Sequence, residues 1–166
     1  MKSQAVLFVV GLFLSINVFA TIPNEQMIHE NLYRGGRPEM ADIDRLVEQN
    51  FKLIINFEND PNAVEAEKKY AEQKGLRYLS FPMNAWDTPN DQAVNEVIQI
   101  LIKSKNQKVF IHCKHGRDRT GLMSALYRVL VQKWKSQDAY TEMIDLGFRK
   151  IFKNMENYYW QKAKDS

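Results

Sequence analysis

The chain has 166 residues and a net charge of +3, with 45% hydrophobic and 26% charged residues, which fits one ordinary globular domain with its own core. So small a charge gives no reason to expect nucleic-acid binding, which usually needs a stronger or more clustered basic excess. The single cysteine excludes an internal disulfide and zinc sites built on paired cysteines, and the three histidines show no metal-ligand spacing, so neither a metal nor another cofactor is expected.

The N-terminus has the features of a secretory signal sequence. The basic start Met1-Lys2 precedes the apolar run AVLFVVGLFL, which is too short for a comfortable membrane span. Val18 and Ala20 stand at the −3 and −1 positions of a cleavage site, so residues 1–20 are predicted to be removed and residues 21–166 to form one domain. The alternative is an uncleaved anchor. Cleavage would leave no stable membrane anchor and would place the protein in a bacterial periplasm or outside the cell, where a lone cysteine is unusual for a structural role.

Predicted strands and helices alternate along the domain. The predicted strands are NLYRGG (31–36), KLIINF (52–57), RYLSFP (77–82) and KVFIH (108–112). The first predicted helix is opened by Pro38 and has Met40, Ile43, Leu46 and Val47 on one face, and the second covers residues 59–75, with Pro61 near its start and Gly75 as its stop.

Four more helices are expected in the second half of the chain. They are a helix with Val94, Val97, Ile98 and Leu101 aligned, a buried helix from Thr120, one capped by Ser136 and ended by Gly147, and a final one containing IFKNMENYYW. The alternation predicts an α/β fold, in which a central, mostly parallel sheet of four to five strands is flanked by helices. Ligands in such sheets bind at the carboxyl ends of the strands.

The stretch HCKHGRDRTG, residues 112–121, follows the last predicted strand and leads into the buried helix. Backbone N–H groups of such a loop can converge on one point, where the helix N-terminus adds its positive dipole end. Gly116 allows a tight, partly left-handed curve. The loop is therefore predicted to be a cradle for an anion, although it lacks the Gly-Lys-Ser/Thr ending of a Walker loop.

Cys113 lies in this positive field. Thiols beside cations and helix N-termini have pKa values of roughly 3.5–7.5, so a nucleophilic thiolate is expected. Arg119 has the planar fork to hold two oxygens of a tetrahedral oxyanion, and the chemistry that fits is thiolate attack on phosphorus, followed by hydrolysis of the phosphocysteine. Thr120 either donates a hydrogen bond to the sulfur or is an ordinary helix-start residue. His112 either orients the loop and tunes the thiolate, or is a buried histidine satisfied by backbone groups.

Cys113 and Arg119 in Cys-x5-Arg spacing, with His before and Thr-Gly after, resemble the signature of the cysteine-dependent protein tyrosine phosphatase superfamily. Chain size and element order are similar to those of its small dual-specificity-like and inositol phosphate phosphatase (PTP-like phytase) members, over residues 31 to about 160. The resemblance implies a dual-specificity phosphatase-like fold in a phosphoric monoester hydrolase. YRGGRP is also similar to a stretch of atypical members that act on inositol pyrophosphates. By that similarity Arg34 and Arg37 are substrate contacts, and the alternative is that they are exposed arginines without a role.

Enzymes of this superfamily take their general acid from a loop outside the cysteine loop, and NAWDTPND offers Asp87 and Asp91. Thr88 is predicted to cap the following helix with Pro89 at its first position, which gives Asp91 a structural task near the third position. Asp87 follows Trp86 and has no such task. It resembles the aspartate of the family's Trp-Pro-Asp loop, so we favour Asp87 as the acid.

Asp118 is an acidic residue within a predicted anion cradle. Either it points away and hydrogen-bonds the backbone of this loop, or it assists acid or water chemistry, as the resemblance of the Arg-Asp-Arg-Thr ending to phosphoinositide and inositol phosphate phosphatases of the superfamily implies.

The loop also carries more potential cations than one phosphate needs. Lys114, His115 and Arg117 would each add a contact to a multiply phosphorylated ring, so inositol polyphosphate is the favoured substrate. The alternatives are a tyrosine or dual-specificity protein phosphatase, a silent phosphate-binding module and, with least support, a rhodanese-like sulfurtransferase.

Overall fold

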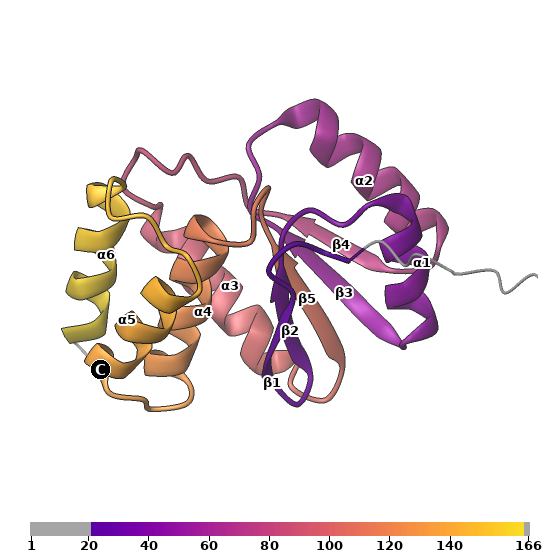
Figure 1. Cartoon of the computed structure of the whole chain (residues 1–166). Coiled ribbons are helices and arrows are strands. Elements are labelled where there is room, and N and C mark those ends of the chain that lie inside the picture. Colours follow the sequence, from indigo (N-terminus) through magenta and orange to yellow (C-terminus); the bar gives the residue numbers. More distant parts are fainter. Residues whose placement is uncertain (1–20, 165–166) are drawn as a thin grey trace, which may run out of the picture.

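The computed structural model describes residues 21–164, so the predicted signal sequence, residues 1–20, lies outside the described residues (Figure 1). The elements in chain order are β1 (Gln26–His29), β2 (Leu32–Gly35), α1 (Met40–Glu48), β3 (Phe51–Asn56), α2 (Pro61–Gln73), β4 (Arg77–Ser80), α3 (Asp91–Lys103), β5 (Lys108–His112), α4 (Asp118–Leu130), α5 (Ser136–Asp145) and α6 (Lys153–Lys164). Within the described part of the chain, every helix is too short or too polar to cross a membrane.

The predicted α/β architecture is confirmed as a five-stranded, mostly parallel sheet. Its strand order is β1-β2-β5-β3-β4, in which β2, β5, β3 and β4 run parallel and β1 pairs with β2 in the antiparallel direction. The sequence did not indicate β1, because QMIH is only four residues long and its two apolar residues, Met27 and Ile28, are adjacent and show no alternation. The strand predicted at 31–36 becomes β2, which delivers Gly35 to the edge where β5 ends at His112.

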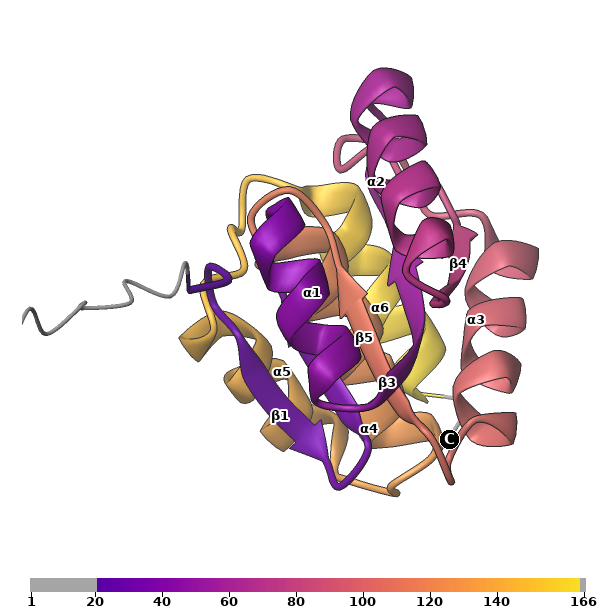
Figure 2. The same ribbon diagram turned by 90° about the vertical axis from the view of Figure 1, so that its right-hand side faces the viewer.

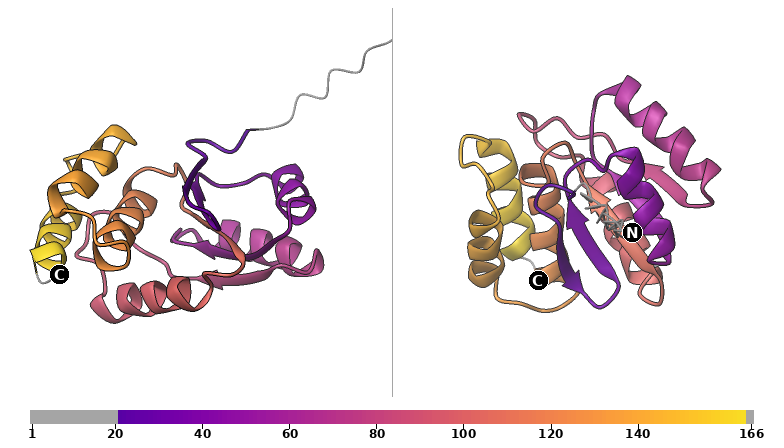
Figure 3. Two further views of the ribbon diagram at one scale, coloured as in Figure 1. Left: turned by 90° about the horizontal axis from the view of Figure 1, so that it is seen from below. Right: turned by 45° about the vertical axis from the view of Figure 1, so that its right-hand side comes forward.

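Helices cover both faces of the sheet (Figures 2 and 3). On one face Ile54 and Phe110 pack in a core with residues of α1 and α2, while on the other face Leu53 and Ile111 pack with α3, α4, α5 and α6. Alternate residues of β3 and β5 therefore enter opposite cores, which explains why both strands are continuous apolar runs. The helix α4 is buried almost all round, as predicted.

Several details of the predicted helices are wrong. Pro38 and Pro89 precede the N-cap residues of α1 and α3, so neither proline occupies the first helical position. Asn90, and not Thr88, caps α3, because its side chain accepts a hydrogen bond from the N–H of Ala93 at 2.9 Å. The hydroxyl of Ser136 donates to the carbonyl of Ala163 in α6 at 2.8 Å, so Ser136 joins two helices and is no cap. Met40 is 45% exposed instead of lying on the buried face of α1. Finally, α4 begins at Asp118, two residues before Thr120.

The carboxyl ends of the parallel strands meet at one edge of the sheet. His112 at the end of β5 pairs in register with Gly35 of β2 and Asn56 of β3, and Asn56 pairs with Ser80 of β4. The segments that follow these strands therefore surround residue 113.

Candidate active site

Cys113 is buried directly after β5, at the start of the loop that leads into α4. Among the described residues, no group accepts a hydrogen bond from the backbone N–H groups of residues 114–117. The first N–H groups of α4 add to this set, since a helix leaves them without a partner in its own backbone. The loop therefore presents N–H donors and a helix N-terminus, which is the arrangement that binds an oxyanion.

The carbonyl groups of the same loop are bound from behind by the N-terminal part of the chain. The side-chain amide of Asn24 donates to the carbonyl of His115 at 2.8 Å, and the backbone N–H of Arg37 donates to that of Lys114 at 3.3 Å. The guanidinium of Arg34 donates to the carbonyl of Gly116. Three successive carbonyls are thus turned away from the N–H face of the loop.

The position of Arg34 corrects both interpretations made from the sequence. Its side chain is only 1% exposed and is bound to the loop carbonyl of Gly116, so it is neither a surface arginine nor placed to contact substrate. Burial lowers the pKa of Arg34 to about 10, although the nearby Cys113 sulfur acts to raise it. Arg34 therefore keeps its charge at neutral pH, close to the nucleophile.

Arg37 also has a structural partner. Its guanidinium forms a bidentate ion pair with the buried carboxylate of Glu58 in the segment after β3. This ion pair joins the segment after β2 to the segment after β3. The Arg37 guanidinium is therefore bound to Glu58 and is not free to make the substrate contact that the sequence had suggested.

Arg119 projects from the first turn of α4 toward the ends of β3 and β4. One of its terminal nitrogens donates to the side chain of Asn59 at 3.0 Å and to the carbonyls of Phe57 and Met83, both at 3.2 Å. Its Nε and its other terminal nitrogen donate to no group in the described part of the chain, so one edge of the fork remains available to an oxyanion.

The two aspartates suggested as general acid have different surroundings. Asp87 is exposed and accepts from the side chain of Asn84 at 2.8 Å. It lines a pocket with Asn59 and Met83, which are the residues that anchor Arg119. Asp87 therefore lies close to Asn59 and Met83, the residues that hold the Arg119 guanidinium.

Asp91, the first residue of α3, is committed elsewhere. Its carboxylate accepts from Tyr158 at 2.9 Å and pairs with Lys162 at 2.7 Å, both in α6. The ammonium of Lys162, then the hydroxyl of Tyr158, hold the pKa of Asp91 below its usual value. A carboxyl group that loses its proton more easily is a poorer general acid.

Asp118 is buried and faces away from the loop's donors, toward the segment between α5 and α6. Its carboxylate accepts from the backbone N–H of Arg149 at 2.9 Å and forms an ion pair with the guanidinium of the same residue at 2.8 Å. The geometry agrees with the interpretation in which Asp118 hydrogen-bonds backbone, but the backbone belongs to a different loop.

Arg149 is the site residue that the sequence analysis missed. Its side chain is 42% exposed, and Asp118, then to a smaller extent Cys113, raise its pKa. Burial, then the charges of Arg117, Lys114 and Arg149, lower the pKa of His115. The cations of the cysteine loop and Arg149 therefore form one positive field. The only available signal for Arg149 was Asp118 itself, because an acid inside a basic loop needs a cation to pair with.

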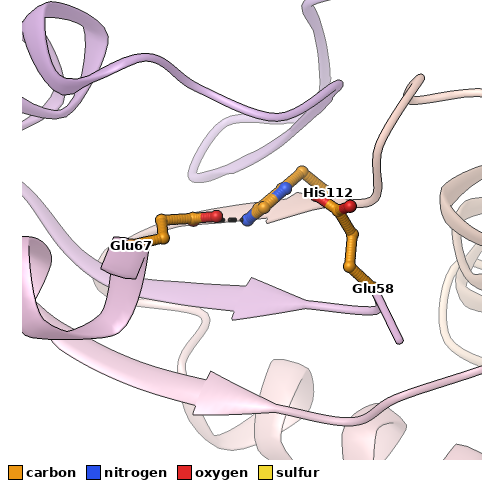
Figure 4. Close-up of side chains that lie close together, drawn as sticks. All are labelled: Glu58, Glu67 and His112. Carbon is orange, nitrogen blue, oxygen red and sulfur yellow. Dashed lines mark ion pairs between the residues drawn. The ribbon is translucent and has the colours of Figure 1, made fainter. Parts of the chain in front are cut away.

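Thr120 and His112 are both fully buried behind the loop. The Thr120 hydroxyl has no hydrogen-bond partner among the described residues, so it remains available to a neighbouring sulfur. His112 is not satisfied by backbone groups, because its ring contacts the carboxylate of Glu67, with Nε2 and Oε1 2.8 Å apart (Figure 4).

Comparison with known proteins gives matches along most of the chain. The family model described as "PTP-NADK: DSP-PTPase phosphatase fused to NAD+ Kinase" matches residues 16–160. The dual specificity protein phosphatase TpbA of Pseudomonas aeruginosa is 31% identical over 134 residues, which are 81% of this chain and 56% of TpbA. The inositol diphosphatase DSP4 of Arabidopsis thaliana is 29% identical over 116 residues, which are 67% of this chain and 57% of that protein. The chain thus spans about half the length of these curated relatives.

Solved structures show the same fold. The crystal structure of TpbA has a TM-score of 0.71 at 30% identity, with 84% of each chain covered. A cysteine-to-serine variant of TpbA in complex with pTyr has a TM-score of 0.69 at 29% identity, with 82% of each chain covered. The core catalytic domain of the PP-IP phosphatase SIW14 from S. cerevisiae, at 21% identity, has a TM-score of 0.68 and shares the fold over 84% of this chain and 88% of that chain.

The loop requires glycine at residue 116. Gly116 has a φ of +67°, and a Cβ there would lie 2.5 Å from the nitrogen of Gly36 and 2.6 Å from the oxygen of Gly35. We expect Gly116→Ala to lower turnover of p-nitrophenyl phosphate by about a hundredfold or more, because the clash displaces the loop's N–H donors. Steady-state kinetics and thermal unfolding would measure both effects.

Gly75→Ala is the matched control. Gly75 has a φ of +82°, but a methyl group added there would have no other atom within 4 Å. This variant should lose only about 1–2 kcal/mol of stability to the left-handed backbone and keep its activity. Near-normal turnover by Gly116→Ala would contradict the packing argument.

Proposed function

Because this chain belongs to the DSP-PTPase family of cysteine phosphatases, we propose that it hydrolyses phosphate monoesters through a phosphocysteine intermediate. The observation that carries the proposal is the loop around Cys113, where N–H donors lack partners in the described chain while the carbonyls are bound from behind. Such donors stabilise the charge that develops on phosphoryl oxygens in the transition state.

In the first step the Cys113 thiolate attacks phosphorus, and the bond from phosphorus to the leaving oxygen breaks. Asp87 gives its proton to that oxygen, and the free edge of Arg119 holds two of the non-bridging oxygens. In the second step a water molecule attacks the phosphocysteine and gives a proton to Asp87. The sulfur–phosphorus bond then breaks, and the Thr120 hydroxyl donates a hydrogen bond to the departing thiolate.

Replacement of the nucleophile tests the reaction. Cys113→Ser should abolish turnover of phosphate esters, because an alcohol in this site is not ionised, while binding of inorganic phosphate persists since the N–H donors are unchanged. Enzyme kinetics and isothermal titration calorimetry would measure the two quantities. Continued turnover by this variant would overturn the phosphocysteine mechanism, and loss of phosphate binding would show that the variant has lost its loop.

Paired aspartate variants test the general acid. With phenyl phosphate, whose leaving group needs a proton, Asp87→Asn should lower kcat by about 10²–10⁴-fold, and the loss should be smaller with p-nitrophenyl phosphate. Asp91→Asn should keep most of the activity and instead lower the melting temperature, because Asp91 joins α3 to Tyr158 and Lys162 of α6. An equally active Asp87→Asn enzyme would remove Asp87 from the mechanism.

We favour inositol polyphosphates as substrates. Lys114 and His115 are exposed on the loop, Arg117 is partly exposed, and Arg149 faces the same region from the segment after α5. These groups surround the place where a single phosphate would bind, and a ring with several phosphates would gain an added contact from each. A phytase-like role in phosphate scavenging follows, in the periplasm or outside the cell if the predicted signal sequence is cleaved.

A protein phosphatase of tyrosine or dual specificity is the second candidate. Trp86 is 60% exposed immediately before Asp87, and its ring is held edge-on to Phe152 with 4.8 Å between the centroids. An exposed ring beside the acid could stack on the aryl group of a phosphotyrosine. The solved complex of TpbA with pTyr adds to the support for this candidate.

A direct comparison of substrates separates the two candidates. We expect kcat/KM for inositol hexakisphosphate to exceed that for phosphotyrosine peptides, and Arg149→Gln to lower the first value by about tenfold, since one charge-assisted contact is worth roughly 1.5–3 kcal/mol. The control is Arg77→Gln, an exposed arginine at the amino end of β4 and so at the opposite edge of the sheet. Dominant turnover of the peptides would favour the protein phosphatase.

A further inference from the structure

The loop that carries Asp87 runs from β4 to α3 and is exposed along its middle. Met83 and Pro89 are buried, whereas the residues between them are exposed or only partly buried. In its central turn, residues 84–87, the N–H of Asp87 donates to the carbonyl of Asn84 at 3.2 Å, and the side chain of Asn84 donates to the Asp87 carboxylate at 2.8 Å. These contacts fix the shape of this acid turn, but they do not fix where it lies relative to the cysteine loop.

Residues at and just before the start of α6 hold the acid turn from outside (Figure 1). The side-chain amide of Asn154 donates to the carbonyl of Trp86 at 2.6 Å, and within the described chain this is the turn's only hydrogen bond to a residue outside it. The Trp86 ring also packs edge-on against the ring of Phe152, with 4.8 Å between the centroids. Phe152 is 4% exposed and belongs to the core, so a fixed side chain supports a tryptophan that is itself 60% exposed. Ala85 adds only partial packing against the same core.

The same segment also contacts the cysteine loop. The guanidinium of Arg149 pairs with the buried carboxylate of Asp118 at 2.8 Å and lies over the Phe152 ring, 4.7 Å from its centroid. The backbone N–H of Arg149 donates to the same carboxylate at 2.9 Å. Residues 149–154 are therefore a bridging segment, which contacts the cysteine loop at one end and the acid turn at the other.

This connection matters because the sheet does not bring the two loops together directly. The cysteine loop follows β5 and the acid loop follows β4, and β3 lies between these two strands. A general acid must come within hydrogen-bond reach of the leaving oxygen, and a displacement of about 1 Å can lower a rate by roughly a hundredfold. Arg119 reaches the acid loop at Met83, before the turn, so the bridging segment is the connection that acts on the turn itself.

We propose that Asn154 and Phe152 are positioning residues for the general acid. They hold the acid turn against the bridging segment, and the ion pair of Arg149 with Asp118 holds that segment against the cysteine loop. Asp87 is thereby kept within reach of the oxygen that leaves phosphorus. The inference rests on the proposed function, because Asp87 protonates the leaving group of that reaction, and both residues act through Asp87 without touching substrate.

Removal of the Asn154 side chain tests the proposal. In Asn154→Ala the Trp86 carbonyl loses its donor, and the folded core is unaffected because Asn154 is exposed. We expect kcat/KM for phenyl phosphate to fall about tenfold, whereas the value for p-nitrophenyl phosphate, whose leaving group needs no proton, falls less than about twofold. The matched control is Asn157→Ala, because Asn157 is exposed on the same helix and its side chain makes no hydrogen bond in the described chain.

A double-mutant cycle shows whether Asn154 acts through the acid. In an Asp87→Asn background, Asn154→Ala should cause no further loss with phenyl phosphate. Equal losses with the two esters, no loss with either, or the same loss in both backgrounds would overturn the proposal, since a merely structural residue would affect both esters alike.

Phe152→Leu tests the second contact and covers the case in which Asn154→Ala does not fold. Leucine keeps an apolar side chain in the core but removes the ring that packs against Trp86, so the same selective loss with phenyl phosphate is expected. Thermal unfolding would identify the folded variants. An unaltered protein that hydrolyses neither ester would refute the proposed function, whereas an active protein whose two variants keep the unaltered ratio of the two esters would refute only this inference.

Discussion

The hydrogen bonds that hold the cysteine loop from behind are the constraint on which the candidate site depends. A peptide group cannot point its N–H and its carbonyl to the same side. The loop can therefore collect N–H donors at one point only if its carbonyls find partners elsewhere. Asn24, Arg34 and the backbone of Arg37 supply those partners for three consecutive carbonyls. The Gly116 carbonyl is buried, and without its partner Arg34 it would be unfavourable by about 1–3 kcal/mol.

This arrangement explains why the first residues of the described chain pack where they do. Gly36 donates to the carbonyl of Pro23 at 2.6 Å, and Ile22 is buried against Gly35 and Phe110. The segment before β1 thus reaches the back of the loop, although it is far from Cys113 in sequence. Gly35, the last residue of β2, and Gly36, which follows it, leave the space that Gly116 fills, so the N-terminal segment and the loop are shaped to each other.

The sequence was sufficient for the parts of the structure that follow from local patterns. The four parallel strands, the helices between them and the position of Cys113 at a strand's carboxyl end all follow from apolar periodicity and turn residues. Helix starts were less certain: Thr88 and Asn90 are both good caps, and only the tertiary position of α3 selects Asn90. The strand β1 has no such pattern, because its pairing with β2 provides nearly all of its order.

Roles that depend on distant partners could not be read from the sequence. The arginines of YRGGRP were interpreted as substrate contacts or as exposed, since nothing local shows that Arg34 meets a carbonyl 82 residues away. Arg149 was overlooked for the same reason: its partner Asp118 lies 31 residues earlier. An acidic residue in a basic motif is a local inconsistency that indicates a partner elsewhere in the chain, and Asp118 is such a residue.

Two buried acids near the loop do not weaken an anion site, because each one has its own cation. Asp118 binds Arg149, and Glu58 binds Arg37. A free arginine would lose side-chain entropy on binding a phosphate, whereas one already held by a carboxylate loses less. Arg149 is an example of such an arginine. Asp118 holds its Nε and Nη2, while Nη1 donates to no group in the described chain and remains available to a phosphate. The carboxylates reduce the net charge of the site, yet they fix the direction in which its positive groups point.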